Sequence, residues 1–149
     1  MGLSIGDKIP LFTLPDTNGY PFSIKELVGK MAFVIYFYPK NNTPSCTKEA
    51  CDFRDAYEDF KSEGAEVVGI SADSPKSHAN FTNKYQLPFI LLSDKNNEVR
   101  KKFKIKNSLF FVPGRETYVI DENGKVSMVF NSLNASEHMK RALKALSKK

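Results

Sequence analysis

Both cysteines of the chain, Cys46 and Cys51, lie in one short segment, YPKNNTPSCTKEAC, which begins at Tyr38. Their spacing of five residues is not the Cys-x-x-Cys spacing of dithiol redox proteins, and it fits no common zinc-ligand pattern. The two histidines, His78 and His138, lie far along the chain without ligand spacing, so we expect no metal site and place both rings on exposed helix faces. From the spacing alone, redox chemistry and inert packing of both thiols remain open.

The residues before Cys46 predict the start of a helix. Thr43 is a favoured N-cap residue and Pro44 a favoured first helical residue, which puts Cys46 at the third helical position. The unpaired amides and the positive end of the helix dipole stabilise an anionic sulfur there, and the thiolate is the nucleophilic form of cysteine. We therefore expect Cys46 to be the reactive thiol.

Cys46 also opens an apolar stripe along the predicted helix, continued by Ala50, Phe53, Tyr57 and Phe60. Cys51 lies off this stripe, because five residues rotate it by about 140° and move it by about 7.5 Å along the axis. The two Cα atoms should then be roughly 8.7 Å apart, beyond the limit of about 7 Å for a disulfide. The thiols cannot bridge while the helix is intact, but they could if its first turns unwound.

The rest of the chain predicts strands and helices in alternation. Apolar runs at Ala32–Tyr38, Glu66–Ala72 and Phe89–Asp94 fit buried strands, while Thr117–Asp121 and Val126–Phe130 flank an Asn-Gly turn as a hairpin. Helices are expected over Pro44–Ser62, ended by Gly64, and over Pro75–Tyr85, Lys95–Phe103 and Ser136–Leu146. A further hairpin turns at Asp16–Gly19, before a short helix capped by Ser23.

This order is α/β, with parallel strands first and an antiparallel hairpin last. It predicts a thioredoxin-like fold, with a mixed central sheet flanked by helices and an N-terminal hairpin extension. A flavodoxin-like sheet is the alternative, but the phosphate loop expected there is not found. We expect one domain over residues 1–149, because the length suits a single core and no linker or repeat interrupts it.

Charge and hydropathy narrow the class of protein. The net charge is +5, but the lysines are scattered, which indicates a solvated surface and argues against nucleic-acid binding. No run reaches the roughly 18 apolar residues of a membrane span. The opening MGLSIGDKIP has neither a signal-peptide nor a transit-peptide pattern. We expect a cytoplasmic location, with plastid or nucleus as the alternative for a trimmed mature domain.

The segment FYPKNNTPSCTKEACDFRD resembles the active-site segment of the peroxiredoxins, and more narrowly of the peroxiredoxin Q or bacterioferritin comigratory protein subfamily. The family motif Pro-x-x-x-Thr-x-x-Cys and its subfamily extension are filled by Pro39, Thr43, Cys46, Glu49 and Cys51. PGRETYVIDENG resembles the later segment that supplies an active-site arginine, here Arg115. GDKIPLFTLPDTNG and VVGISADSP also resemble the family, so the likeness covers nearly the whole chain.

The resemblance implies a thiol-dependent peroxidase of the atypical two-cysteine type, acting in antioxidant defence. Cys46 would be the peroxidatic cysteine, which attacks hydrogen peroxide or an organic hydroperoxide and becomes a sulfenic acid. Cys51 would be the resolving cysteine, which closes an intramolecular disulfide after the helix start unfolds locally. Thioredoxin or a glutaredoxin-type dithiol would then recycle the enzyme, which the resemblance implies to be a monomer without metal or organic cofactor.

The same resemblance implies roles for the flanking residues. Thr43 would hydrogen-bond the peroxide, Pro39 would shield the sulfur, and Arg115 would stabilise charge as the O–O bond breaks. Glu49 would orient an arginine through a bidentate pair. Ser45 departs from the glycine that the subfamily often has, with little effect expected at a helix N-terminus.

Two other functions compete with this interpretation. A thioredoxin-like disulfide reductase would need the Cys-x-x-Cys spacing that the chain lacks. A basic nucleic-acid-associated protein with redox chemistry attached would reveal itself by a salt-dependent shift of DNA.

Overall fold

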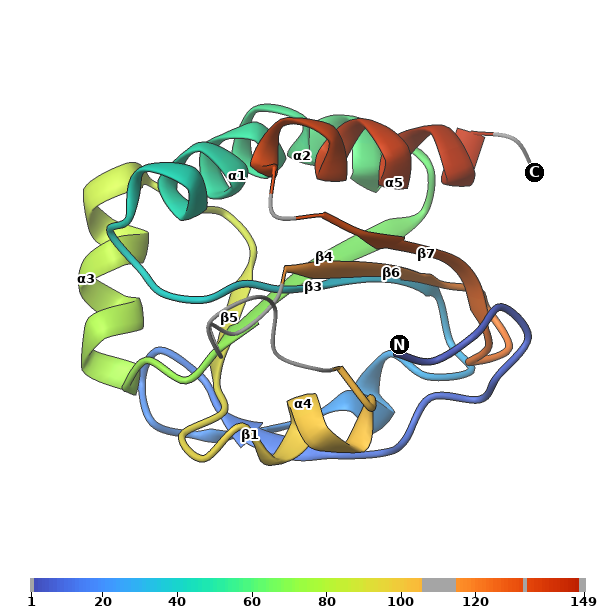
Figure 1. Ribbon diagram of the computed structural model, residues 1–149, viewed down its shortest axis with the longest axis horizontal. Coiled ribbons are helices and arrows are strands. Elements are labelled where there is room, and N and C mark those ends of the chain that lie inside the picture. Colours follow the sequence, from blue (N-terminus) through green and yellow to red (C-terminus); the bar gives the residue numbers. More distant parts are fainter. Residues whose placement is uncertain (1, 106–114, 133, 148–149) are drawn as a thin grey trace.

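The computed structural model describes residues 2–105, 115–132 and 134–147, and a five-stranded mixed sheet lies at its centre (Figure 1). The strand order is β5-β4-β3-β6-β7, with bounds β3 Ala32–Phe37, β4 Ala65–Ser71, β5 Ile90–Ser93, β6 Glu116–Ile120 and β7 Val126–Asn131. Strands β3, β4 and β5 are parallel, whereas β6 runs antiparallel to both β3 and β7. Strand β6, antiparallel to both of its neighbours, excludes the flavodoxin-like alternative, because that sheet is parallel throughout. The mixed sheet matches the predicted thioredoxin-like fold.

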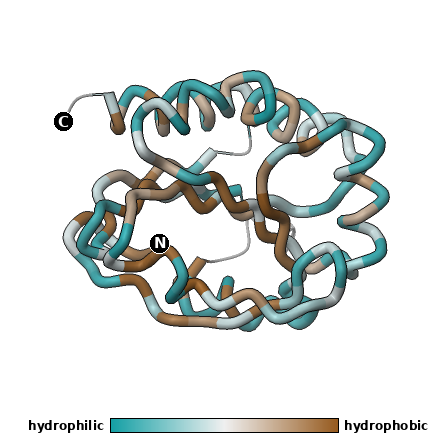
Figure 2. The backbone as a smooth tube through the Cα atoms, turned by 180° about the vertical axis from the view of Figure 1, so that it is seen from behind, coloured by the Kyte–Doolittle hydropathy of each residue, from teal (hydrophilic) through white to brown (hydrophobic). Residues whose placement is uncertain are grey.

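Strand β3 shows why its sequence is apolar throughout. Every residue from Ala32 to Phe37 is buried, because both faces of the sheet are covered. Val34 and Tyr36 point into one hydrophobic cluster, and Phe33 and Ile35 point into the other. Figure 2 shows these hydrophobic strands running through the middle of the molecule between more polar segments.

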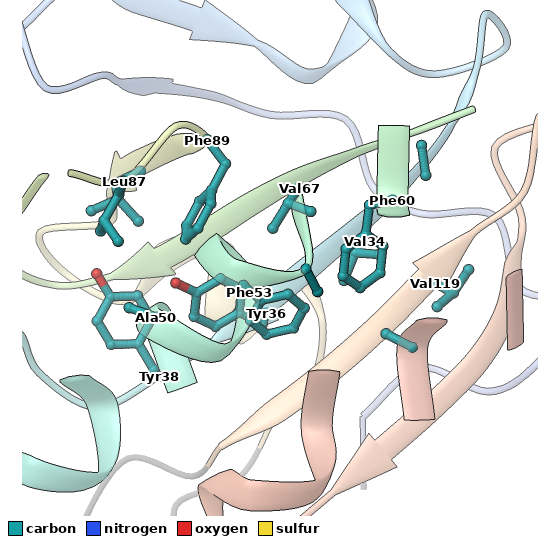
Figure 3. Packing of buried hydrophobic residues seen from close by; sticks show 14 of the residues in the cluster. Val34, Tyr36, Tyr38, Ala50, Phe53, Phe60, Val67, Leu87, Phe89 and Val119 are labelled. Carbon is teal, nitrogen blue, oxygen red and sulfur yellow. The ribbon is translucent and has the colours of Figure 1, made fainter. Parts of the chain in front are cut away.

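One face of the sheet is covered by α1 (Pro44–Asp55), α2 (Tyr57–Ser62) and α5 (His138–Ser147), with α3 (Pro75–Tyr85) beside them (Figure 1). The predicted apolar stripe of α1 faces inward, where Phe53 stacks on Tyr36 with ring centroids 4.6 Å apart. Figure 3 shows Ala50 and Phe53 against the aromatic side chains of the sheet. This packing holds α1, and with it Cys46, in a fixed position over β3.

The opposite face is covered by the N-terminal segment and by α4. The predicted N-terminal hairpin is present as β1 (Thr13–Pro15) and β2 (Pro21–Ser23), followed by a single 3-10 turn, η1 (Ile24–Glu26). Ser23 caps this turn as predicted, since its hydroxyl accepts from the Lys25 amide. α4 (Glu98–Lys102) is shorter than the helix predicted over Lys95–Phe103.

The predicted long helix after β3 is divided at Ala56 into α1 and α2. The helical hydrogen bonding still continues through this residue, because the Ala56 amide donates to Asp52 and its carbonyl accepts from Phe60. Gly64 ends α2 with a φ of 75°, in the left-handed region that favours glycine. The closing helix begins with another 3-10 turn, η3 (Ala135–Glu137), before α5.

Candidate active site

Cys46 lies in the first turn of α1, as the sequence predicts. Thr43 is the N-cap, with extended backbone angles, and Pro44 is the first helical residue. The Cys46 side chain is only 2% exposed, so its sulfur has little contact with bulk water. A helix start leaves amides unpaired at this position, and these amides and the helix dipole favour negative charge on the sulfur.

The hydroxyl of Thr43 does not cap the helix. It donates instead to the carbonyl oxygen of Lys40, at 3.0 Å, because the loop turns back on itself through Asn42, which has a positive φ. The Thr43 side chain therefore stabilises the loop before α1. It accepts no hydrogen bond from the backbone amides of the first turn of the helix. Pro39, at the other end of the loop, is half-buried directly after Tyr38, and Ser45 is exposed.

Arg115 is brought to the sulfur by the antiparallel strand β6, which it directly precedes. Its Nη2 donates to Sγ of Cys46 at 3.3 Å, and the arginine is only 3% exposed. Burial alone would lower the pKa of Arg115, but the nearby Glu49 and Cys46 raise it above its ordinary value. The guanidinium is thus a permanent cation beside the sulfur. Pro113 and Gly114, which belong to the same predicted segment, lie outside the described residues.

Glu49 is fully buried one turn after Cys46, and it accepts from Arg115. The contact joins Nη1 to Oε1 at 2.5 Å, whereas Oε2 has no hydrogen bond within the described part of the chain. The predicted bidentate pair is therefore replaced by a contact through one carboxyl oxygen. Burial raises the pKa of Glu49 to about 8, although Arg115 acts in the opposite direction. The carboxyl group favours its uncharged form at neutral pH.

Cys51 is half-buried, and both thiols are free in this structure. It lies outside the apolar cluster that contains Cys46, as the helical spacing predicts. The expectation that the two cysteines do not bridge while α1 is wound is therefore confirmed.

The sequence prediction for the histidines is wrong, because His78 and His138 are both fully buried. His78 contacts Asn41 and the Leu92 carbonyl, and His138 contacts Thr117 and the Ser132 carbonyl. The spacing could have revealed His138, which lies four residues before Ala142 and eight before Leu146, on the buried face of α5. A polar residue at such a position needs partners that only the tertiary structure supplies.

Arg100 is a second buried arginine that the sequence did not single out. Its guanidinium lies over the Phe37 ring, 5.6 Å from the centroid, and its Nη2 donates to the Tyr38 carbonyl at 3.4 Å. Burial lowers its pKa, and Asp94 opposes that shift. Arg100 therefore adds positive charge at the end of β3, from which the Pro39–Thr43 loop departs.

Within the described residues, no cluster of three or more potential ligands could hold a metal ion, and no helix is long and apolar enough to cross a membrane.

Comparison with known proteins gives consistent matches. The model of the AhpC/TSA family matches residues 5–129. The chain is 52% identical over 143 residues to the chloroplastic peroxiredoxin Q of Sedum lineare, covering 95% of this chain and 76% of the relative. Peroxidoxin BcpB from Mycobacterium tuberculosis superposes with a TM-score of 0.90 at 37% identity, covering 98% and 97% of the two chains. Peroxiredoxin Q from Xanthomonas campestris gives 0.85 at 29% identity, covering 94% and 96%.

Proposed function

The chain belongs to the AhpC/TSA family, within the peroxiredoxin Q group, and from this premise we propose how its two cysteines reduce a peroxide. It is a thiol-dependent peroxidase, an oxidoreductase that acts on peroxides with thioredoxin-like reductants. The residue roles that follow are our proposal.

Cys46 is the peroxidatic cysteine, and the contact between Arg115 and its sulfur carries this assignment. The Cys46 thiolate attacks one oxygen of the hydroperoxide, an S–O bond forms, and the O–O bond breaks. The sulfur is oxidised to a sulfenic acid, while the leaving oxygen takes a proton and departs as water or an alcohol. Arg115 stabilises negative charge on the sulfur beforehand and on the peroxide oxygens during attack.

The neighbouring residues shape and orient this site. Thr43 binds the peroxide through its hydroxyl oxygen, which can accept a hydrogen bond while its own proton is donated to the Lys40 carbonyl. Pro39, half-buried at the end of β3, limits the access of water to the sulfur. Glu49 orients the guanidinium of Arg115 through Oε1, so that Nη2 is directed at the sulfur.

Cys51 is the resolving cysteine. Its thiol attacks the sulfenic sulfur of Cys46, forms the disulfide and releases water. The free thiols lie on different faces of α1, so this step requires the first turns of the helix to unwind. A dithiol reductant of the thioredoxin or glutaredoxin type then reduces the exposed disulfide by exchange.

The remaining assignments concern the whole chain. We propose that residues 1–149 form a single domain that acts as a monomer, without metal or organic cofactor and without nucleic acid. We place it in the cytoplasm, with the plastid as the alternative supported by relatives named chloroplastic. Localisation of a fluorescent fusion decides between these compartments.

Mass spectrometry after one equivalent of hydrogen peroxide tests the proposed chemistry. The expected product is a chain that has lost two hydrogens, with a peptide joining Cys46 to Cys51. A stable sulfenic acid without the disulfide would keep Cys46 as the nucleophile but remove Cys51 from its role. A chain in which Cys46 is not oxidised would overturn the proposal.

A further inference from the structure

His138 is a fully buried polar side chain that the proposed chemistry does not use, although it lies beside the candidate site. It opens α5, and three other segments of the chain meet at its ring. Thr117 comes from β6, Ser132 directly follows β7, and Glu49 comes from α1. A histidine so placed can affect the site through its protonation and its tautomer.

The contacts of the ring define its tautomer. Nε2 lies 2.7 Å from the carbonyl oxygen of Ser132, which can only accept, so Nε2 carries a proton. Nδ1 lies 2.7 Å from Oγ1 of Thr117. Burial lowers the pKa of His138 to about 4, with Arg115 acting in the same direction and the Ser132 contact opposing it. The ring is therefore neutral at neutral pH, and Nδ1 accepts from the Thr117 hydroxyl.

The same Nδ1 faces the unpaired oxygen of Glu49. Oε2 lies 3.6 Å from Nδ1, too far for a hydrogen bond but close enough for a strong electrostatic effect away from water. An ionised Glu49 would turn a negative oxygen toward the lone pair of Nδ1. The neutral ring therefore opposes ionisation of this carboxyl group, in the same direction as burial.

We propose that His138 is a positioning residue for peroxide reduction: its neutral ring keeps Glu49 uncharged and so leaves the positive charge of Arg115 to the Cys46 sulfur. Arg115 contacts Glu49 through Nη1 and Cys46 through Nη2, so a carboxylate would compete with the thiolate for one cation. The inference rests on the proposed role of Cys46.

Among the described residues, three charged or titratable groups lie near this ring. Glu49 from α1 and Arg115 at the start of β6 face it. Arg141, one turn along α5, lies over the Phe130 ring that packs against it. β7 contributes the Phe130 ring, at a centroid distance of 4.7 Å, and β6 contributes the Thr117 hydroxyl. Neither of these two titrates near neutral pH, so a change at His138 should act on the sulfur through Glu49 and Arg115.

The test measures thiolate absorbance against pH in a Cys51→Ser background, where Cys46 is the remaining thiol. His138→Gln keeps a donor that can reach Ser132 but loses the acceptor at Nδ1, so the pH midpoint of thiolate formation should rise by about half a unit or more. His138→Asn keeps an acceptor near the Nδ1 position and loses the Ser132 contact, so its midpoint should stay close to that of the parent.

The two variants separate positioning from a structural role. If only the Asn variant shifts, or if both shift equally, the ring acts through Ser132 or through its bulk, and the proposal is overturned. Unchanged midpoints in both variants overturn it as well. His78→Gln is the matched control, since His78 is equally buried and its Nε2 lies 3.0 Å from the Leu92 carbonyl. It should lower stability without moving the midpoint.

Thr117→Val tests the same idea without altering the ring, should the His138 variants fail to fold. Loss of the hydroxyl leaves the proton on Nε2, where the Ser132 carbonyl holds it, and frees the lone pair of Nδ1 for the Glu49 carboxyl group. The midpoint should therefore not rise, and a rise like that of His138→Gln contradicts the proposal. Adding Glu49→Gln should abolish the effect of His138→Gln; a shift that persists in this double variant also contradicts it. Peroxidase activity in Cys46→Ser would overturn the proposed function itself. The titrations require no turnover, so their failure would overturn only the role of His138.

Discussion

Nη2 of Arg115 lies 3.3 Å from Sγ of Cys46, although the two residues are separated by 69 positions in the chain. The contact exists because β6 pairs antiparallel with β3, while α1 packs on the same sheet. A cation from the strand side and a helix N-terminus therefore act on one sulfur.

Cys46→Ser should abolish peroxidase activity, because a serine hydroxyl stays protonated at neutral pH and cannot replace the thiolate. Peroxide consumption coupled to thioredoxin is the measurement. Turnover near that of the parent protein would refute the assignment of Cys46.

Cys51→Ser should leave a single burst of peroxide reduction, about one equivalent per chain, and block recycling by thioredoxin. The sulfenic acid still forms on Cys46, but no second thiol in the chain can resolve it. Rapid-mixing measurement of the burst tests this expectation. Normal recycling in this variant would mean that the resolving thiol comes from another molecule.

Arg115→Met should slow the reaction with peroxide by about a hundredfold or more, the usual effect of removing a donor that stabilises transition-state charge. The second-order rate constant, measured by stopped flow, reports this step directly. Arg54→Met is the control, since Arg54 pairs with Asp55 and with the Tyr85 carbonyl, and neither contact involves the Cys46 sulfur. A large fall in the melting temperature of Arg115→Met would instead indicate a structural arginine.

The buried Glu49 predicts that stability falls as pH rises above about 6.5. Its pKa is raised from 4.5 to about 8, so the folded protein keeps a proton that the unfolded chain has lost. The free energy of unfolding decreases with pH wherever the folded state binds more protons. The pKa of His138 is lowered from 6.5 to about 4, so between these values the unfolded chain binds more protons and stability rises with pH. This rise opposes the decline caused by Glu49, but only below about pH 6.5.

Urea unfolding at several pH values tests this linkage. Glu49→Gln should flatten the decline between pH 6.5 and 8, whereas the exposed Glu58→Gln should leave it unchanged. Equal slopes for the parent and Glu49→Gln would show that the folded protein holds no such proton on Glu49.

Oxidation should increase hydrogen exchange at the start of α1, because the disulfide requires its first turns to unwind. Amides from Thr47, the first one bonded in α1, to Cys51 should lose protection after peroxide treatment, while those of β3, buried throughout, should not. Exchange detected by mass spectrometry on reduced and oxidised protein gives the comparison. A protected α1 in the oxidised protein would contradict local unfolding.

Much of the fold follows from local sequence signals. The apolar run of β3 requires a strand covered on both faces, and the Thr43-Pro44 pair is suited to a helix start because its backbone angles are favoured there. The apolar stripe of α1 also follows from helical periodicity alone. The places where these predictions missed are small, such as the division at Ala56 and the shorter α4.

By itself, then, the sequence determined which elements form, which cysteine stands at a helix start and why the two thiols stay apart. Only the tertiary structure decided what surrounds that sulfur. Arg115 and Glu49 meet beside it because distant segments pack together, and the burial of His138 depends on the Thr117 hydroxyl of β6 and on the Ser132 carbonyl just after β7. Local propensity acts over a few residues, whereas the charge state of a buried group depends on all its neighbours in space.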